Sequence, residues 1–450
     1  MKILYILPWV PYPLNNGGNQ AVFMMTDAAR RLHQVSLILY IHNAGERERM
    51  EHLKALWPDV TFFLFDAQEE ARIKGEIQPS PYASMPWLNR KVCEILDYWH
   101  HSTKRKLDRR QWRHALQQLS QAKSKASAIA ALGCFVRANS NLFHQTNNDL
   151  SPAFCKYVKE VSAKGFDIVQ VEFYEYLPLV YMLPANCKRV FVHHELRFVR
   201  NENELSLLQN PLPTDFLILE EEKAKELVAL KHYDAVITLT DIDRNHLIQY
   251  LPEEKIYVSP AITQNVNLEK KTFQTAQELV FVGSGSHFPN ADGMLWFCSQ
   301  VVPILRQHHE SIPRIHITGQ WRRELKAYVK RQCPEAVFNG FVDDLPTFIN
   351  GKISIVPIRI GSGMRMKILD SASAAAPLVT TSKGCEGLPV VHKQHCLIAD
   401  TPETYADALV EILADKNLQQ SLATKAQDVN NAMLNDAELI QQRLAIYKKI

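Results

Sequence analysis

The sequence predicts an α/β protein with two doubly wound domains, each a parallel sheet covered by helices on both faces. Short apolar strands alternate with longer helical patterns along nearly the whole chain, which is typical of parallel sheets. The 450 residues exceed what one hydrophobic core ordinarily fills. A polar, aperiodic segment, residues 261–277, separates two sets of strands, and we interpret it as the linker between the domains.

The composition narrows the class of protein. With 46% hydrophobic and 22% charged residues the chain is typical of soluble globular proteins, and a net charge of +3 gives no argument for nucleic acid as a partner. The eight cysteines form no CxxC pair, which is typical of reduced thiols, so we expect a cytoplasmic location. No apolar run approaches the roughly 18 residues that cross a bilayer.

The first domain is expected over residues 1–260. Its strands are predicted in the segments KILYILP, VSLILYI, VTFFLF, DIVQVEF, RVFVHHE, YDAVITL and KIYVSP. The first segment is not interpreted as a signal peptide, because its apolar run is short, three prolines follow it, and no small-residue cleavage site is present. It is better explained as a buried first strand.

A helical insertion is expected at about residues 78–164, where strand signals are nearly absent. The insertion contains a basic segment, WHHSTKRKLDRRQWRHALQQL. Its one acidic residue is Asp108, and its cations are Lys104, Arg105, Lys106, Arg109, Arg110 and Arg113. Two interpretations stay open. The segment is a solvated basic helix face, or it makes a peripheral contact with an anionic membrane surface or a polyanionic acceptor through these cations, Trp99 and Trp112.

The second domain is expected over residues 278–430. Its strands are predicted in ELVFVGS, RIHITG, AVFNGF, ISIVPI, PLVTT and CLIAD. The helix in TPETYADALVEILAD begins with a capping-box pattern at Thr401. A last helical stretch, residues 431–450, follows the completed sheet and is expected to pack back on the first domain.

Three glycine-containing turns join a strand to a helix, where backbone N–H groups can bind an anion or simply form the turn. The first contains Gly17 and Gly18. The second contains Gly283 and Ser284 in a GxGxxF pattern, which lacks the third glycine of a dinucleotide fingerprint and argues against NAD.

The third turn, RIGSGMRMKILD, is the most informative. Gly361 and Gly363 free the backbone, while Arg365 and Lys367 stand in the first helical turn, where cations are unfavourable for the helix dipole. An anion at the same place would explain both features. Asp370 lies about one turn further on, where it either pairs with Lys367 or accepts hydrogen bonds from sugar hydroxyls.

Polar side chains also follow two strands of the first domain. His193 and His194 end RVFVHHE, and Glu172 ends DIVQVEF. Because ligands of α/β proteins bind at the carboxyl ends of parallel strands, these are candidate acceptor-site residues. The alternatives are a histidine satisfied by a backbone carbonyl and a glutamate that caps a helix. A zinc site is not predicted, since the spacing of Cys385, His392, His395 and Cys396 matches no common motif.

These motifs resemble those of GT-B-fold glycosyltransferases, specifically the retaining family 4 enzymes that use sugar nucleotides. The likeness rests on ELVFVGSGSHFPNADGMLWF, NGFVDDLP, VPIRIGSGMRMKILDSASAAAPLVTTSKGCEGL and CLIADTPETYADALVEIL, and on LPWVPYPLNNGGNQ and YDAVITLTDIDRN in the first domain. It covers most of the chain except the helical insertion. The resemblance implies two Rossmann-like domains facing a cleft, the first binding the acceptor and the second the nucleotide sugar.

The resemblance also implies roles for individual residues. Asp370 stands where the family has the second glutamate of its paired-glutamate motif, which holds the donor ribose, and Ser362 stands in the place of the first. Ser284 and Asn290 occupy the places of the family's diphosphate-binding arginine and lysine. We therefore assign the diphosphate to the cations of the third turn.

The predicted donor site contains Arg365 and Lys367 as the groups that stabilise the leaving diphosphate, with Gly17, Gly18, Gly283, Ser284, Phe341, Val342, Arg359, Gly361, Ser362, Gly363, Met364 and Asp370 around the donor. Phe341 and Val342 match the family loop near the nucleotide base. His194 matches the family's active-site histidine, and Glu172 is placed with it among the catalytic residues.

The implied reaction moves a sugar from a nucleoside diphosphate to a glycan or lipid-linked acceptor with retention of anomeric configuration, and neither a cofactor nor a metal is expected. If Glu172 acts as a general base, inversion is the alternative. Two other classes stay open: a non-catalytic sugar-nucleotide or glycan binder of the same fold, and a dinucleotide-dependent oxidoreductase. A dinucleotide-dependent oxidoreductase would need an acidic residue at the end of the second predicted strand, where this sequence has His42. The sequence leaves the oligomeric state open.

Overall fold

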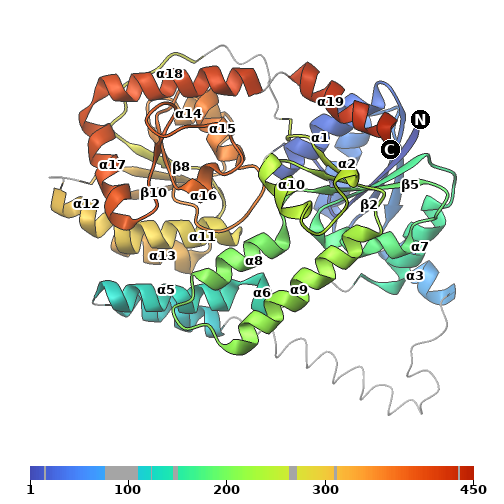
Figure 1. Cartoon of the computed structure of the whole chain (residues 1–450), viewed down its shortest axis with the longest axis horizontal. Helices are drawn as coiled ribbons and strands as arrows, with labels where there is room; N and C mark the ends of the chain where they lie inside the picture. The colour runs from blue at the N-terminus through green and yellow to red at the C-terminus, as the bar shows by residue number, and fades with distance from the viewer. Residues whose placement is uncertain are drawn as a thin grey trace.

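The computed structural model describes residues 1–14, 17–76, 110–122, 124–144, 150–262, 271–308, 312–433 and 436–450. It confirms the predicted fold class, because the chain forms two α/β domains built on parallel sheets of seven and six strands. Figure 1 shows the domains side by side, with both chain termini at the first domain.

The first sheet has the order β3-β2-β1-β4-β5-β6-β7, and every pairing is parallel. Its strands lie in the seven predicted segments: β1 (Lys2–Leu7), β2 (Gln34–Tyr40), β3 (Thr61–Phe65), β4 (Ile168–Glu172), β5 (Lys188–His193), β6 (Ala235–Thr238) and β7 (Ile256–Val258). The helical elements of this domain are α1 (Gly17–Arg30), α2 (Ala44–Leu56), α3 (Ala67–Glu76), α7 (Pro152–Ser162), η1 (Tyr174–Met182), α8 (Arg197–Ser206), α9 (Pro213–Lys231), α10 (Asp241–Leu247) and η2 (Glu253–Lys255).

The second sheet has the order β10-β9-β8-β11-β12-β13, again all parallel. Its strands lie in the six predicted segments: β8 (Leu279–Phe281), β9 (Ile315–Thr318), β10 (Ala336–Gly340), β11 (Ile353–Val356), β12 (Leu378–Thr380) and β13 (Leu397–Ile398). The helical elements are α11 (Phe288–Trp296), η3 (Phe297–Val301), α12 (Val302–His308), α13 (Arg323–Gln332), α14 (Leu345–Ile349), α15 (Met366–Ser373), α16 (Ser382–Cys385) and α17 (Pro402–Ala414).

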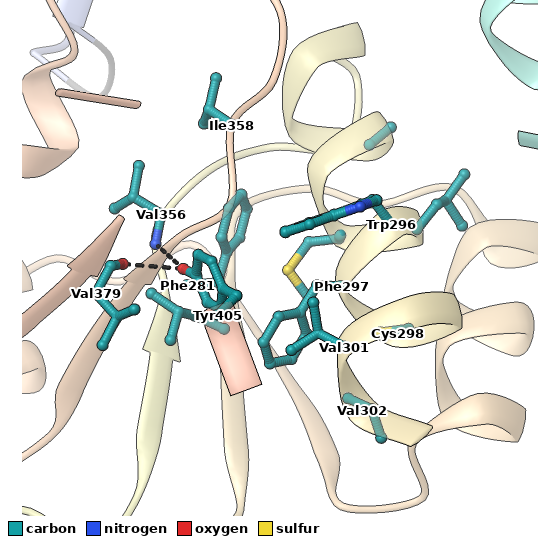
Figure 2. Packing of buried hydrophobic residues seen from close by; sticks show 14 of the residues in the cluster. Phe281, Trp296, Phe297, Cys298, Val301, Val302, Val356, Ile358, Val379 and Tyr405 are labelled. Carbon is teal, nitrogen blue, oxygen red and sulfur yellow. Dashed lines mark hydrogen bonds between the residues drawn. The ribbon is translucent and has the colours of Figure 1, made fainter. Parts of the chain in front are cut away.

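The core of the second domain packs around Tyr405 of α17 (Figure 2). Its hydroxyl accepts a hydrogen bond from the Val356 amide at 3.1 Å and donates one to the Val379 carbonyl at 2.9 Å. Trp296 and Phe297 contact the same ring edge-on. Tyr405 thus ties α17 to two adjacent strands, β11 and β12.

Residues 110–122 and 124–144 of the predicted insertion are mainly helical and cover the second domain, whereas α7, which lies within its predicted bounds, packs in the core of the first domain. Residues 110–121 are helical, and α5 (Lys125–Asn139) and α6 (Asn141–His144) follow. Phe135 packs against Phe288 of α11 with 6.1 Å between ring centroids, and Trp112 is only 7% exposed and lies beneath the Arg322 guanidinium. Trp112 is therefore not available for the membrane contact that was one of the two interpretations of this segment. Trp99 and residues 104–109 lie outside the described residues.

The end of the chain returns to the first domain (Figure 1). After α18 (Lys416–Met433), α19 (Asp436–Lys449) contacts α1, and Leu444 and Tyr447 join the apolar core around β1. Arg443 fixes the helix there by donating to the side chain and the carbonyl of Ser259 at 2.7 and 3.0 Å. Among the described helices, none combines the length and the apolar character needed to span a bilayer.

Candidate functional site

A cavity of about 660 Å³ lies between the two domains. Trp9, Phe173 and His194 reach it from the loops after β1, β4 and β5, and Gly285 and Ile360 reach it from the loops after β8 and β11. The carboxyl ends of both sheets therefore face this cavity, which is where open parallel sheets bind ligands. The insertion closes one side, since Trp112 and Phe135 also belong to the lining.

His194 and Glu172 form a pair at this cavity. Glu172 ends β4 and His194 follows β5, and these strands are neighbours in the sheet. His194 Nε2 lies 2.6 Å from Glu172 Oε2. The Phe173 ring is stacked on the imidazole with 4.0 Å between centroids and an interplanar angle of 11°. The pair is thus held in one orientation, and the imidazole is the member that lines the cavity.

His193 points elsewhere. Its Nε2 lies 2.7 Å from Glu226 of α9, which also accepts hydrogen bonds from the amides of Arg197 and Phe198 at the start of α8. A buried carboxylate at the first turn of a helix satisfies amides that would otherwise lack partners. Glu226 therefore fixes the segment that carries His194 and Arg197.

Arginine side chains give the cavity a cationic wall. Arg197, Arg200 and Arg365 line it, and the pKa of Glu195 beside them is lowered to about 2, because Arg200 and Arg197 outweigh the opposing effect of burial. Nε and Nη1 of Arg197 and Nη2 of Arg365 are buried and have no hydrogen-bond partner among the described residues. Buried guanidinium donors ordinarily have acceptors. An anionic ligand in the cavity would provide them.

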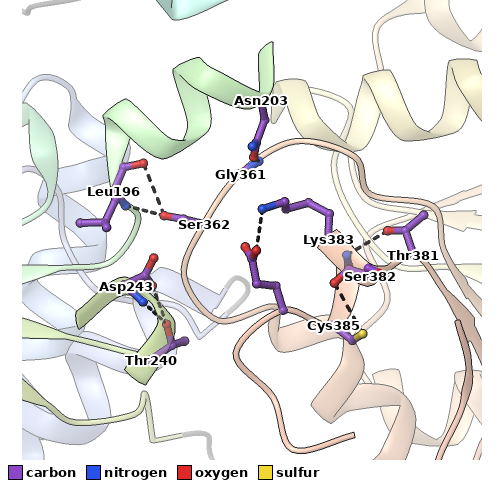
Figure 3. Close-up of polar contacts among 12 residues, drawn as sticks. Leu196, Asn203, Thr240, Asp243, Gly361, Ser362, Thr381, Ser382, Lys383 and Cys385 are labelled. Carbon is purple, nitrogen blue, oxygen red and sulfur yellow. Dashed lines mark hydrogen bonds and ion pairs between the residues drawn. The ribbon is translucent and has the colours of Figure 1, made fainter. Parts of the chain in front are cut away.

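The glycine loop that the sequence singled out makes the contact between the domains (Figure 3). Ser362 Oγ accepts a hydrogen bond from the Leu196 amide at 2.6 Å and donates one to the Leu196 carbonyl at 3.4 Å. The Gly361 amide donates to Asn203 Oδ1 at 3.1 Å. These bonds join the second domain to the loop before α8 and to α8 itself.

At Gly363 the backbone of the second domain comes very close to the backbone of the first domain. The Gly363 amide donates to Asp243 Oδ2 of α10 at 3.1 Å, and a Cβ atom at Gly363 would lie closer than 3.0 Å to the His194 carbonyl oxygen. The amides of Gly361 and Gly363 are thus bonded to protein acceptors. The expectation that these amides bind an anion is corrected: in this arrangement they hold the domains together. Arg365 is the residue of the loop that lines the cavity and has a guanidinium nitrogen, Nη2, without a hydrogen-bond partner among the described residues.

Lys367 and Asp370 lie behind the cavity wall. The Lys367 ammonium donates to Asn290 Oδ1 at 2.5 Å rather than to Asp370. Burial lowers the pKa of Lys367 to about 7 and raises the pKa of Asp370 to about 7. Neither residue is part of the cavity lining. Their predicted contacts with the diphosphate and the ribose stay predictions.

Other predicted donor-site residues have protein partners. Arg359 forms a two-bond ion pair with the fully buried Asp292, at 2.7 and 3.1 Å. Gly283 has a φ of 153° and approaches Asn290, and Ser284 donates to the Gln320 carbonyl. Gly283 and Ser284 shape the turn after β8, and neither these two residues nor Arg359 belong to the lining.

The remaining predicted residues divide between the cavity and the surface. The lining includes Gly17, Gly18, Ser362 and Met364. Met366 lies against Gly17, where a Cβ atom would be closer than 3.0 Å to its side chain, so the start of α1 needs glycine. Phe341 is 59% exposed on the loop after β10, and Val342 follows it.

The histidines near Cys385 and Cys396 have structural partners. His392 Nδ1 accepts from the Ile398 amide and His395 Nδ1 from the Val391 amide, both at 2.9 Å. These bonds shape the turn before β13. Across the described parts of the chain, no group of three or more potential ligands could hold a metal ion.

The sequence reasoning missed several residues of the site. Arg197 and Glu195 stand in the segment that contains His194, so a charged run after a buried strand could have indicated them. Gln170, a polar residue inside the apolar β4, was a second available signal. Trp9 and the contribution of the insertion had no local signal, because both depend on how the domains meet.

Comparison with solved structures defines the class of fold, that of GT-B glycosyltransferases. Thermosynechococcus elongatus sucrose-phosphate synthase is similar, with a TM-score of 0.63 at 14% identity over 100% of this chain and 98% of that one. Anabaena HepE, solved with UDP and glucose, gives 0.59 at 13% identity and covers 100% of both chains. A variant of Staphylococcus aureus TarM, solved with fondaparinux, alpha-GlcNAc-glycerol and UDP, gives 0.59 at 12% identity over 99% of both.

The family comparison concerns the second domain. Residues 276–415 match the family model described as Glycosyl transferases group 1. This range contains the glycine loop, Arg365 and the turn after β8. No curated protein sequence matches the chain significantly.

Proposed function

We propose that the protein is a glycosyltransferase that moves a sugar from a nucleoside-diphosphate sugar to a glycan or lipid-linked acceptor. The observation that carries the proposal is that Arg197 and Arg365, which line the cavity between the domains, have buried guanidinium nitrogens without a hydrogen-bond partner among the described residues. Such nitrogens match the geometry of phosphate oxygens. The family match of the second domain and the UDP bound in HepE and TarM support the same ligand class.

In this proposal the arginines stabilise the leaving group. As the bond from the anomeric carbon to the diphosphate breaks, the carbon gains oxocarbenium character and negative charge grows on the diphosphate. Arg365 on the second domain and Arg197 on the first would both bind that charge, and preorganised charge of this kind usually contributes most to catalysis. Because the two cations come from different domains, the site is complete only when the domains are closed.

Retention of configuration is part of the proposal. Inversion would need a general base, and Glu172 was the predicted candidate for it. Both oxygens of Glu172 already accept hydrogen bonds, Oε1 from Gln170 and Oε2 from His194. We therefore assign Glu172 to orienting His194, which contacts the transferred sugar or the acceptor.

The test is calorimetric titration with UDP, GDP, ADP, their common sugar conjugates and NAD. Arg365→Ala and Arg197→Ala are compared with Arg314→Ala, an exposed arginine of the second domain. We expect the wild type to bind one class of sugar nucleotide. A charge-assisted hydrogen bond contributes about 1.5–3 kcal/mol, so each cavity variant should weaken binding about 10- to 100-fold.

The outcomes separate the alternatives. Binding of NAD alone, or equal affinities for all three variants, would contradict the proposal. Tight binding of a sugar nucleotide without hydrolysis or transfer to any offered glycan or lipid-linked acceptor would favour a non-catalytic binder. NMR of the product anomeric proton distinguishes retention from inversion.

A further inference from the structure

We propose that Tyr447 and Gln170 are positioning residues that orient Glu172 and thereby keep the His194 imidazole in the tautomer with its proton on Nε2 and Nδ1 as the acceptor. The catalytic importance of this arrangement rests on the proposed function. The arrangement itself does not, because it follows from hydrogen bonds among buried groups.

A continuous chain of hydrogen bonds leads from the C-terminal helix to the cavity. Tyr447 Oη lies 2.6 Å from Gln170 Oε1, and Gln170 Nε2 lies 2.5 Å from Glu172 Oε1. Glu172 Oε2 lies 2.6 Å from His194 Nε2. Tyr447, Gln170 and Glu172 are each at most 3% exposed. Water therefore cannot readily replace any of these partners.

The donors in this chain can be assigned from chemistry alone. A carbonyl oxygen only accepts, so Tyr447 donates its single hydroxyl proton to Gln170, and Tyr5, 3.1 Å away, donates to Tyr447. Burial raises the pKa of both phenols, so both hydroxyls remain protonated. With its carbonyl bonded to Tyr447, Gln170 turns its amide N–H toward Glu172.

Glu172 then accepts at both oxygens. Since Oε1 accepts from Gln170, the bond at Oε2 requires a proton on Nε2 of His194. A neutral imidazole has one proton, which leaves Nδ1 with a free lone pair. Nδ1 is therefore the ring nitrogen that can accept a proton or a hydroxyl hydrogen bond from a ligand in the cavity.

The position of Tyr447 is fixed independently of the site. Arg443, one helical turn earlier, is bonded to Ser259, and Leu444 packs in the core of the first domain. The α19 helix thus brings the Tyr447 hydroxyl to the side chain of Gln170 on β4. We assign this helix a part in the geometry of the site.

The test uses the full chain labelled with ¹⁵N-histidine. The imidazole signals of His194 are identified by their absence in His194→Gln. We expect the wild-type shifts, at a pH where the ring is neutral, to show the proton on Nε2. A proton on Nδ1 would overturn the proposal.

Tyr447→Phe and Gln170→Leu interrupt the series of hydrogen bonds at two different points. Gln170→Leu removes the amide that donates to Glu172, and Tyr447→Phe removes the hydroxyl that holds the Gln170 carbonyl. In both variants the Glu172 carboxylate is held less firmly, so the ¹⁵N shifts of the neutral His194 ring should move away from the pattern with the proton on Nε2 alone. The carboxylates and guanidinium groups that line the cavity belong to Glu175, Glu195, Arg197, Arg200, Arg322 and Arg365, and the substitutions leave all of them in place. Turnover should fall about fivefold, the effect of one hydrogen bond of ordinary strength, with the donor KM unchanged.

Tyr405→Phe is the matched control, because it removes a buried tyrosine hydroxyl with two partners from the core of the second domain. It should lower the melting temperature and leave the His194 signals as in the wild type. Unchanged His194 signals in a folded Tyr447→Phe protein would overturn the proposal. Loss of nucleotide binding in the calorimetric test would instead contradict only the proposed function, since the NMR result needs no donor.

Discussion

Gly363→Ala tests whether the contact between the domains is needed for donor binding. Gly363 has a φ of 77°, and a Cβ atom there would lie closer than 3.0 Å to the His194 carbonyl oxygen. The carbonyl belongs to the first domain and the glycine to the second. The new methyl group cannot be accommodated by a side-chain rotation, so we expect it to push the two loops apart.

The magnitude follows from what this separation breaks. The left-handed backbone of an alanine costs about 1–2 kcal/mol wherever it occurs. Opening the contact also loses the bonds from Ser362 to Leu196 and from Gly363 to Asp243, each contributing about 1 kcal/mol. The closed form should therefore lose about 2 kcal/mol relative to the open form, which corresponds to roughly 30-fold weaker binding of a ligand that needs both domains.

Gly165→Ala is the control for the free-energy cost of placing an alanine in the left-handed backbone conformation. Gly165 has a φ of 85°, and a Cβ atom there would meet nothing within 4 Å. The Gly165→Ala substitution should destabilise the protein slightly and leave its nucleotide affinity unchanged. Calorimetry gives the affinity, and small-angle scattering gives the radius of gyration. The reasoning is refuted if Gly363→Ala matches Gly165→Ala in both measurements.

Two further predictions concern residues beside the cavity. Arg359→Ala should destabilise the protein by about 3–5 kcal/mol, because it leaves the buried Asp292 carboxylate unpaired. Thermal unfolding should show that adding Asp292→Asn restores part of the lost stability. A loss of nucleotide affinity without a loss of stability would instead indicate that Arg359 binds the donor. Asp370→Asn should stabilise the protein more at pH 7 than at pH 5. Burial raises the pKa of Asp370 to about 7, so the wild type loses stability as pH rises from about 4 to 7, by at most about 4 kcal/mol, and asparagine does not titrate. A pH-independent difference in denaturant unfolding would show that Asp370 titrates normally.

The strands could be predicted from the sequence because both sheets are parallel and buried. Such strands read as continuous apolar runs, and each run found in the sequence became a strand. The candidates His194 and Glu172 could be found for a related reason. They end strands that are neighbours in the sheet, and neighbouring parallel strands bring their carboxyl ends together.

The contact between the domains could not be predicted in the same way. The glycines at 361 and 363 looked like an anion loop, because a glycine-rich strand-to-helix junction has the same local sequence whether its amides face a ligand or another domain. The bonds to Asn203 and Asp243 decide between these alternatives. They join residues 158 and 120 positions apart, a distance over which no local pattern carries information.

The position of Lys367 shows the limit of assigning roles one motif at a time. The resemblance places a diphosphate-binding lysine where this chain has Asn290. In the structure the Lys367 ammonium lies 2.5 Å from the Asn290 side-chain oxygen, although the two residues are 77 positions apart. Lys367 thus reaches, from a different element, the residue that stands at the place of the family's lysine. Burial lowers its pKa to about 7, so an approaching diphosphate would favour the charged form.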